Sequence, residues 1–158
     1  MLKLAISIAL PVAVGGLSGY ATAHGVSTWY PTLVKPSFNP PAWVFGPVWT
    51  ALYLMMGVAA FLVWRKGLDH DWVQLALAAF VGQLVLNGLW SILFFGLQSP
   101  GWALLEIMGL WLAIAVTIHL FLKIVPLAAA LLLPYWAWVS FAAVLNASLW
   151  WLNRAPPV

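Results

Sequence analysis

Residues 29–50 read WYPTLVKPSFNPPAWVFGPVWT and lie between two strongly apolar runs of the chain. Prolines at positions 31, 36, 40 and 41 remove backbone donors and restrict φ, so a regular helix cannot run through Trp29–Pro41. We therefore expect an ordered, non-helical connection that carries several aromatic side chains. This connection could be an aromatic belt at a membrane surface, with prolines ending one helix and starting the next. It could equally be a lid over a pocket between helices.

The composition indicates that most of the protein surface faces lipid. Hydrophobic residues make up 65% of the chain and charged residues only 6%, whereas about a quarter of the residues of a soluble domain are charged. The absence of cysteine excludes disulfides and thiolate metal sites. The six Lys and Arg residues lie at the ends of apolar runs, so the net charge of +3 forms no basic patch for a nucleic acid.

Five apolar runs are each long enough to cross a bilayer, which takes about 20 residues of helix. They span residues 4–23, 44–64, 72–97, 101–122 and 126–152. The links after the second, third and fourth runs are short, which favours antiparallel neighbours. The sequence thus predicts an all-α membrane protein, a single domain over residues 1–158. It would be a bundle of five transmembrane helices with a long ordered loop between helices 1 and 2.

The first run has an alternative interpretation as a signal peptide. Lys3 precedes it, and the sequence ATA at residues 21–23 is typical of a cleavage site. However, the run exceeds the roughly 7–15 apolar residues of such a peptide. It also carries Gly15 and Gly19, a spacing that lets membrane helices approach closely. We favour a retained transmembrane helix.

The distribution of basic residues indicates an orientation, because Lys and Arg gather on the cytoplasmic side of membrane proteins. The side of the N-terminus carries Lys3, Arg65, Lys66 and Lys123, and the opposite side carries Lys35 and Arg154. This difference favours an N-terminus inside the cell.

Three of the runs place aromatic rings and amides along one helix face, since residues three and four apart share a face. These stripes are Phe45, Trp49 and Tyr53; Gln83, Asn87, Trp90 and Phe94; and Tyr135, Trp138, Ala142 and Asn146. Flat rings with few hydrogen-bonding groups suit a pocket for a planar apolar ligand. The alternative is that the rings only pack helices together and the amides only bridge them. A lipid-facing amide at mid-span is costly, so we expect Asn87 to point inward and line a cavity.

Other chemistries have little support in the sequence. His24, His70 and His119 fall in a predicted loop, a second loop and a helix end, without metal-ligand spacing. Glu106 lies near the start of the fourth run, and we expect its carboxylate to reach the lipid headgroups. No serine, histidine and acid are placed for hydrolysis. We expect no metal site and no acid–base catalytic centre.

The chain carries a set of motifs that occur together in one family. They are Trp29-Tyr30, Lys35-Pro36-Ser37-Phe38-Asn39-Pro40-Pro41, Val44–Tyr53, Asn87-Gly88-Leu89-Trp90-Ser91, Phe94-Phe95-Gly96, Leu133–Trp138 and Asn146. With them the chain resembles the TspO/MBR family, the tryptophan-rich sensory proteins related to the mitochondrial translocator protein. The resemblance covers essentially the whole chain. It implies a multi-pass protein of a bacterial membrane, a homodimer, and a pocket within the bilayer that is capped by the first loop.

The resemblance also implies ligands and the residues that bind them. The ligands would be porphyrins such as protoporphyrin IX, haem and small aromatic drugs, with no intrinsic cofactor. Together with the helix faces, it predicts the ligand-binding residues Tyr30, Pro41, Phe45, Trp49, Tyr53, Asn87, Trp90, Tyr135, Trp138 and Ala142. Animal members carry a cholesterol motif in the fifth helix, a Tyr followed closely by a basic residue. Here no Lys or Arg follows Tyr135 before Arg154, so cholesterol transport is not expected.

Three functions are compatible with such a pocket. The protein could be a receptor or sensor that binds porphyrins and regulates tetrapyrrole metabolism or a stress response. It could be an enzyme that degrades bound porphyrin with light and oxygen, using Trp49 and Trp138 as redox partners. It could also transport porphyrins or drugs, although proton-coupled transport would want an acid at mid-membrane, and the sequence argues against one. We favour the receptor.

Two ridges of small residues suit helix–helix contact in a membrane. They are Gly15 with Gly19 in the first run and Ala78 with Gly82 in the third. We expect a homodimer that uses at least one of them, with the ridge of the third run favoured. The alternative is that both ridges pack inside one bundle.

Overall fold

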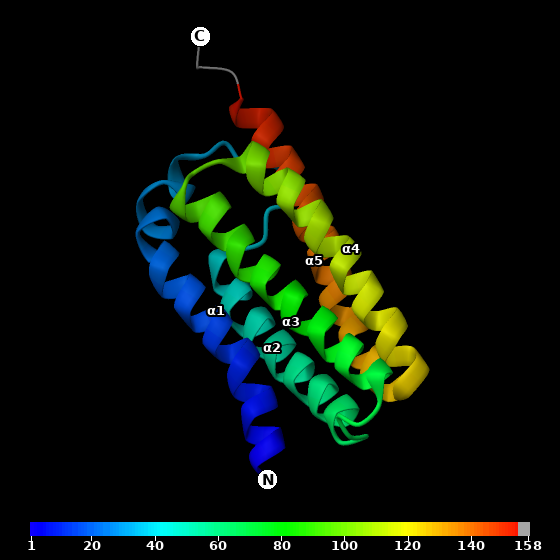
Figure 1. The fold of residues 1–158 in the computed structure, drawn as a ribbon. Helices are drawn as coiled ribbons and strands as arrows, with labels where there is room; N and C mark the ends of the chain where they lie inside the picture. The colour runs from blue at the N-terminus through cyan, green and yellow to red at the C-terminus, as the bar shows by residue number, and fades with distance from the viewer. Residues whose placement is uncertain (155–158) are drawn as a thin grey trace.

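The computed structural model describes residues 1–154, which form five long helices. These are α1 (Leu2–Thr28), α2 (Ala42–Trp64), α3 (Asp71–Ser91), α4 (Pro100–Ile124) and α5 (Pro126–Asn153). Each helix, with α3 extended to Gly96, is long and apolar enough to cross a membrane, and no strand occurs among the described residues. Figure 1 shows the helices side by side, with the two termini at opposite ends of the bundle. The predicted fold class, an all-helical integral membrane protein, is confirmed.

Two helix boundaries differ from the sequence prediction. α1 continues past the predicted end at Ala23 to Thr28, so His24 lies in a helix and not in a loop. The α-helix ends shortly before Pro31, whose missing N–H and fixed φ exclude a regular α-helix through that position. The connection is also helical over Tyr30–Thr32, which form a 3₁₀ turn with the proline near its start. Residues 33–41 are irregular, as predicted.

The other links are short and make neighbouring helices antiparallel. Between α2 and α3, Gly67 adopts a φ of +99°, which glycine tolerates and other residues rarely do. Between α4 and α5, Val125 alone is non-helical, with an extended backbone that suits a residue before proline. As a result, α3, α4 and α5 follow one another across the bundle (Figure 1).

The apolar core lies among α2, α3, α4 and α5. Its largest fully buried apolar side chains include Met56, Phe80, Ile107, Leu132 and Tyr135. In membranes such cores are held by close packing and not by exclusion of water, because lipid tails are as apolar as the side chains.

α1 joins this bundle through small residues. Its buried positions are Ser7, Pro11, Ser18, Thr22 and Gly25. A Cβ at Gly25 would overlap the backbone oxygen of Phe95, and a Cβ at Gly57 of α2 would meet the backbone of α1 at Ile8. These two contacts let helix backbones touch, which small residues permit in membrane proteins.

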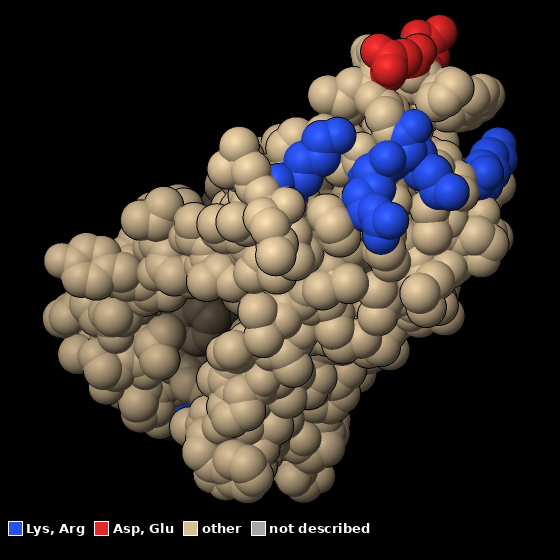
Figure 2. Space-filling model, turned by 90° about the horizontal axis from the view of Figure 1, so that it is seen from below, with Lys and Arg blue, Asp and Glu red and all other residues tan. Residues whose placement is uncertain are grey.

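Apart from Glu106 within α4, charged side chains lie at the two ends of the bundle. Figure 2, seen from the end that carries the N-terminus, shows Lys and Arg side chains gathered on one part of the surface with acidic residues beyond them. They come from the start of α1, the link after α2 and the end of α4. The long sides of the bundle are apolar, as contact with lipid requires.

Candidate functional site

A cavity of about 860 Å³ lies between α1, α2, α5, the end of α3 and the connection from α1 to α2. This volume is within the range of about 300–1,000 Å³ that is typical of small-molecule sites. Figure 2 shows the molecule hollowed on one side, with mostly uncharged residues around the hollow. The wall is made mainly of aromatic and small apolar side chains.

The structure brings most of the predicted ligand-binding residues to this cavity. Those on its wall are Tyr30, Pro41, Phe45, Trp49, Tyr53, Trp90, Trp138 and Ala142. Asn87 and Tyr135 are not on the wall. Both are buried, with relative exposures of 2% and 0%. The prediction that Asn87 lines a cavity is therefore corrected: it lies one layer behind the wall, covered by Tyr53.

Aromatic pairs set the shape of the wall. Trp49 and Tyr53 of α2 stack with their ring centroids 5.4 Å apart and an angle of 27°. Phe45 meets Trp138 of α5 edge to face, at 6.0 Å and 73°. Trp49 also packs its edge against the buried Tyr135. Because each ring is held by another, the wall is preformed and needs little reordering to accept a ligand.

A buried chain of hydrogen bonds supports the wall from behind. The Tyr53 hydroxyl donates to Oδ1 of Asn87 over 2.9 Å, and Nδ2 of Asn87 donates to the Tyr135 hydroxyl over 3.2 Å. The Tyr135 hydroxyl in turn donates to Oε1 of Gln83 over 2.9 Å. Asn87 thus ties α2, α3 and α5 together, which is the bridging role that the sequence left as its alternative.

A second amide, Asn146 of α5, lies on the cavity wall itself. Its Oδ1 accepts from Nε1 of Trp90 over 3.0 Å, and its Nδ2 donates to the backbone oxygen of Pro100 over 2.8 Å. The amide therefore connects the ends of α3, α4 and α5. Both of its polar atoms are paired within the protein, so its main effect is to orient Trp90.

The connection from α1 to α2 covers one end of the cavity. The Tyr30 ring packs edge-on against Phe95 at 5.5 Å, and its hydroxyl donates to Oδ1 of Asn39 over 2.8 Å. Burial raises the pKa of the Tyr30 hydroxyl above its usual value of 10.0, so the group stays neutral at physiological pH. Tyr30, Pro31, Lys35 and Asn39 all contribute to the cavity wall. This geometry supports the interpretation of the connection as a lid.

The end of α5 holds the lid in place. Oδ1 of Asn153 accepts from the backbone N–H of Val34 over 2.9 Å, and Nδ2 of Asn153 donates to the backbone oxygen of Val34 over 2.9 Å. One side chain therefore satisfies both backbone groups of a residue in an irregular segment. The pair is exposed, so water competes with it and the contact is reversible.

Asn153→Ala is expected to loosen the lid. The change removes both hydrogen bonds to Val34, each worth about 0.5–1.5 kcal/mol. Amide exchange at Val34 should become roughly tenfold faster, because the free energy of local opening falls. Hydrogen exchange with mass spectrometry on the detergent-solubilised protein measures it.

Ser148→Ala is the matched control, since its hydroxyl bonds only to Val144 within α5 and lies on an exposed face. That variant should leave exchange at Val34 unchanged. Equal amide exchange at Val34 in the wild type and in Asn153→Ala would rule out that Asn153 holds the lid.

Several cavity residues were missed by the sequence-based prediction, among them a group on α1 and Phe95. Gly15, Ser18, Gly19 and Thr22 of α1 line the cavity. Their spacing of three and four residues, with small or hydroxyl side chains, was a usable signal. Phe95 was also missed, because Ile92–Gly96 form a π-helical turn that an ordinary helical periodicity does not describe.

Glu106 does not behave as the sequence predicted. Both of its carboxylate oxygens are buried and have no hydrogen-bond partner among the described residues. The residue as a whole is half-buried, in a helix that packs against α3 and α5, but its carboxylate is turned away from solvent. The carboxylate is thus buried in the protein, within a helix long and apolar enough to cross a membrane. Glu106 is not on the cavity wall.

The histidines and acids of residues 1–154 form no group of three that could hold a metal ion. The cavity holds aromatic rings, hydroxyls, amides and one lysine. Such a set can enclose a flat ligand and orient it by a few polar contacts.

Comparison with known proteins gives a consistent result. The profile of the TspO/MBR family matches residues 7–152. The tryptophan-rich protein TspO of Archaeoglobus fulgidus is 43% identical over 153 residues, which cover 97% of this chain and 98% of that protein. The translocator protein of Homo sapiens is 40% identical over 148 residues, 92% of this chain and 88% of that protein. The tryptophan-rich sensory protein of Cereibacter sphaeroides is 38% identical over 129 residues, 82% of this chain and 79% of that protein.

Proposed function

The chain belongs to the TspO/MBR family, and on this basis we propose that it is a membrane receptor for porphyrins such as protoporphyrin IX or haem. The ligand would occupy the cavity under the lid. Its binding would regulate tetrapyrrole metabolism or a stress response. The names of its relatives indicate a sensory protein or a translocator. The proposal adds a specific class of ligand.

One observation supports the proposal above the others: a cavity of about 860 Å³ in the membrane-spanning bundle is walled by aromatic rings from several helices. A porphyrin is a flat, rigid, aromatic ring that stacks on such side chains. Trp49 on α2 and Trp138 on α5 present rings to this space. The few polar groups on the wall would fix the orientation of the ring.

The proposal is tested by titrating the purified protein in detergent with protoporphyrin IX in the dark. Tryptophan fluorescence and porphyrin absorbance should change together and saturate at one porphyrin per chain. Haem should compete for the same site. A porphyrin signal that rises without saturation, as for partition into detergent micelles, would refute the proposal.

A second candidate function is the light-driven degradation of bound porphyrin by oxygen. It is favoured by the position of two oxidisable rings, Trp49 and Trp138, on the same cavity wall. Illumination of the complex in air would then bleach the porphyrin faster than illumination of free porphyrin. Bleaching at equal rates would exclude the degradation function and leave the receptor function as the proposal.

We also propose that the protein is a homodimer that uses the exposed face of α3. In the α1 ridge, Gly15 packs inside the bundle, since a Cβ there would overlap the Tyr53 ring, whereas a Cβ at Gly19 would meet nothing within 4 Å. Ala78 and Gly82 of α3 are exposed, and a Cβ at Gly82 would meet nothing within 4 Å. The flanking Val81 and Val85 are exposed as well. This face is thus open to a second copy.

Gly82→Leu is expected to shift the dimer towards monomer by about tenfold or more in dissociation constant, because a bulky side chain prevents close backbone approach. Porphyrin binding should persist, since Gly82 is not on the cavity wall. Analytical ultracentrifugation in detergent measures the shift. Gly109→Leu is the matched control, because a Cβ at Gly109 of α4 also meets nothing. Equal dimer affinity in the two variants would refute the α3 interface.

A further inference from the structure

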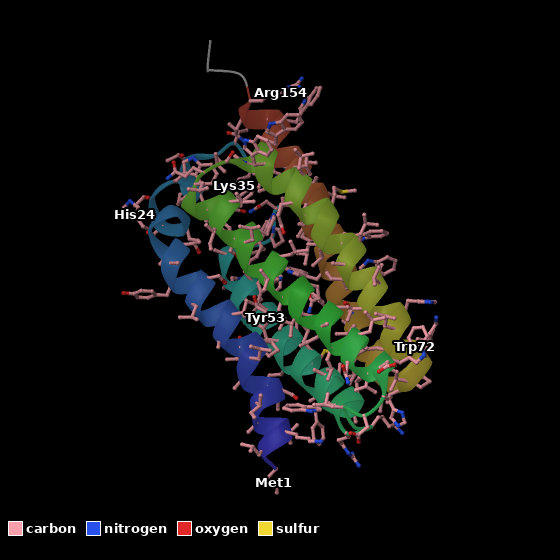
Figure 3. The ribbon with its side chains drawn as sticks, viewed as in Figure 1. Met1, His24, Lys35, Tyr53, Trp72 and Arg154 are labelled. Atoms are coloured by element: carbon pink, nitrogen blue, oxygen red, sulfur yellow. The ribbon has the colours of Figure 1, made fainter. Side chains whose placement is uncertain are left out.

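The cavity wall carries one charged side chain among the described residues, Lys35 of the lid. Figure 3 shows Lys35 towards the end of the bundle that carries the C-terminus, whereas Tyr53 lies near the middle. The positive charge is therefore at the covered end of the cavity, and the rest of the wall is neutral.

The ammonium group of Lys35 is held in position but is not neutralised. Its Nζ donates to the backbone oxygens of Pro31 and Leu33, each over 3.1 Å, and lies 5.0 Å from the centroid of the Tyr30 ring. An ammonium group has three N–H donors. These contacts use two of them and leave one for a further acceptor.

None of the acidic side chains of residues 1–154 lies on the cavity wall with this group. Asp69 and Asp71 lie around the start of α3, next to Trp72, at the opposite end of the bundle in Figure 3. Glu106 lies within α4, off the cavity wall. Lys35 is half-buried, so it is partly shielded from water. Within residues 1–154 a partly desolvated positive charge thus faces the cavity without a carboxylate partner.

From this geometry we infer that Lys35 selects ligands with an acidic group and sets their direction in the cavity. The acid would accept a hydrogen bond from the free N–H of Lys35 beneath the lid, and the flat aromatic body would extend inward along Trp49 and Trp138. A charge-assisted hydrogen bond is stronger when partly shielded from water than at an open surface. The inference deepens the proposed function and rests on it, because it assigns the recognised class as planar aromatic acids.

The test compares ligands that differ only in charge. Protoporphyrin IX carries two carboxylates, and its dimethyl ester keeps the same ring without them. Affinities are measured for the wild type, Lys35→Gln and Lys35→Arg in a neutral detergent. Lys35→Gln should weaken binding of the acid about tenfold and leave binding of the ester unchanged. Lys35→Arg should retain most of the affinity for the acid.

The comparison with the ester also distinguishes a direct contact between Lys35 and the acid from an indirect effect of Lys35 on the structure of the lid. Lys35→Gln removes the two hydrogen bonds to the lid backbone, and a purely structural role would weaken acid and ester equally. The ratio of the two losses cancels any difference in micelle partition, because that difference is the same for every variant. Lys3→Gln is the control, since Lys3 lies in the first turn of α1, away from the cavity wall. It should change neither affinity.

Equal losses for acid and ester in Lys35→Gln would overturn the inference, and so would a loss of acid binding in Lys3→Gln as large as that in Lys35→Gln. A parallel series uses 1-pyrenebutyric acid and its methyl ester as smaller fluorescent probes. If neither porphyrin binds the wild type, the proposed porphyrin function fails. The pyrene pair then still decides whether Lys35 selects an acid, by the same comparison.

Discussion

Gly25→Ala is expected to destabilise the protein by roughly 3 kcal/mol, at the upper end of the usual cost of overpacking. The added Cβ would overlap the backbone oxygen of Phe95 in the π-helical turn. A backbone atom cannot rotate away as a side chain can, so α1 or the turn must move. The lid follows directly after α1, and both flank the cavity. Porphyrin binding should therefore weaken together with stability.

The measurement is thermal unfolding in detergent, followed by tryptophan fluorescence, with a porphyrin titration below the transition. Gly16→Ala is the matched control, because it lies on the same helix and its Cβ would meet nothing within 4 Å. That change should be neutral or slightly stabilising, since alanine favours a helix by up to about 1 kcal/mol over glycine. The same stability in both variants would show that α1 does not need its close contact with Phe95.

Trp138→Ala is expected to weaken porphyrin binding by about 1–3 kcal/mol, or roughly 5- to 150-fold. Trp138 lies on the cavity wall, where Phe45 and Phe141 hold its ring at centroid distances of 6.0 Å and 5.5 Å. Removing the indole deletes a flat surface on which the ligand can stack. It also frees Phe45, which loses its partner. The affinity follows from quenching of the remaining tryptophan fluorescence.

Two further variants test whether the loss of affinity depends on an aromatic ring at position 138 of the cavity wall. Trp72→Ala removes an indole that is 58% exposed at the start of α3, away from the cavity, and should leave affinity unchanged. Trp138→Phe keeps a ring and should recover much of the affinity that Trp138→Ala loses. If Trp72→Ala and Trp138→Ala bind porphyrin equally well, the cavity is not the porphyrin site.

Much of the architecture was predictable because two physical limits act on short stretches of sequence. A bilayer requires about 20 apolar residues per helix, and the chain shows five such runs. Proline at positions 31, 36, 40 and 41 prevents a regular helix there, and residues 33–41 are irregular in the structure. The exact end of α1 was not predictable from apolar content, because the helix continues through polar residues to Thr28.

The cavity was predictable only in part. Helical periodicity identifies which side chains point inward, and Trp49, Tyr53 and Trp138 do lie on the wall. Helical periodicity does not tell whether an inward side chain lies on the cavity wall or behind it. Asn87 points inward too, but Tyr53 lies in front of it and donates a hydrogen bond to its Oδ1. The same limit applies to Glu106, whose carboxylate oxygens are buried in the folded protein.

The sequence by itself determined that most of the surface faces lipid, how many helices span the membrane, and which segment forms the lid. Those properties depend on residues close together in the chain. Only the tertiary structure decided which inward side chains reach the cavity, that α1 packs against the backbone of Phe95 through Gly25, and that Asn153 holds Val34 of the lid. These outcomes require contacts between residues far apart in sequence, such as Val34 and Asn153. A local pattern carries no information on which helix will cover which, because close packing is decided by the side chains of both partners.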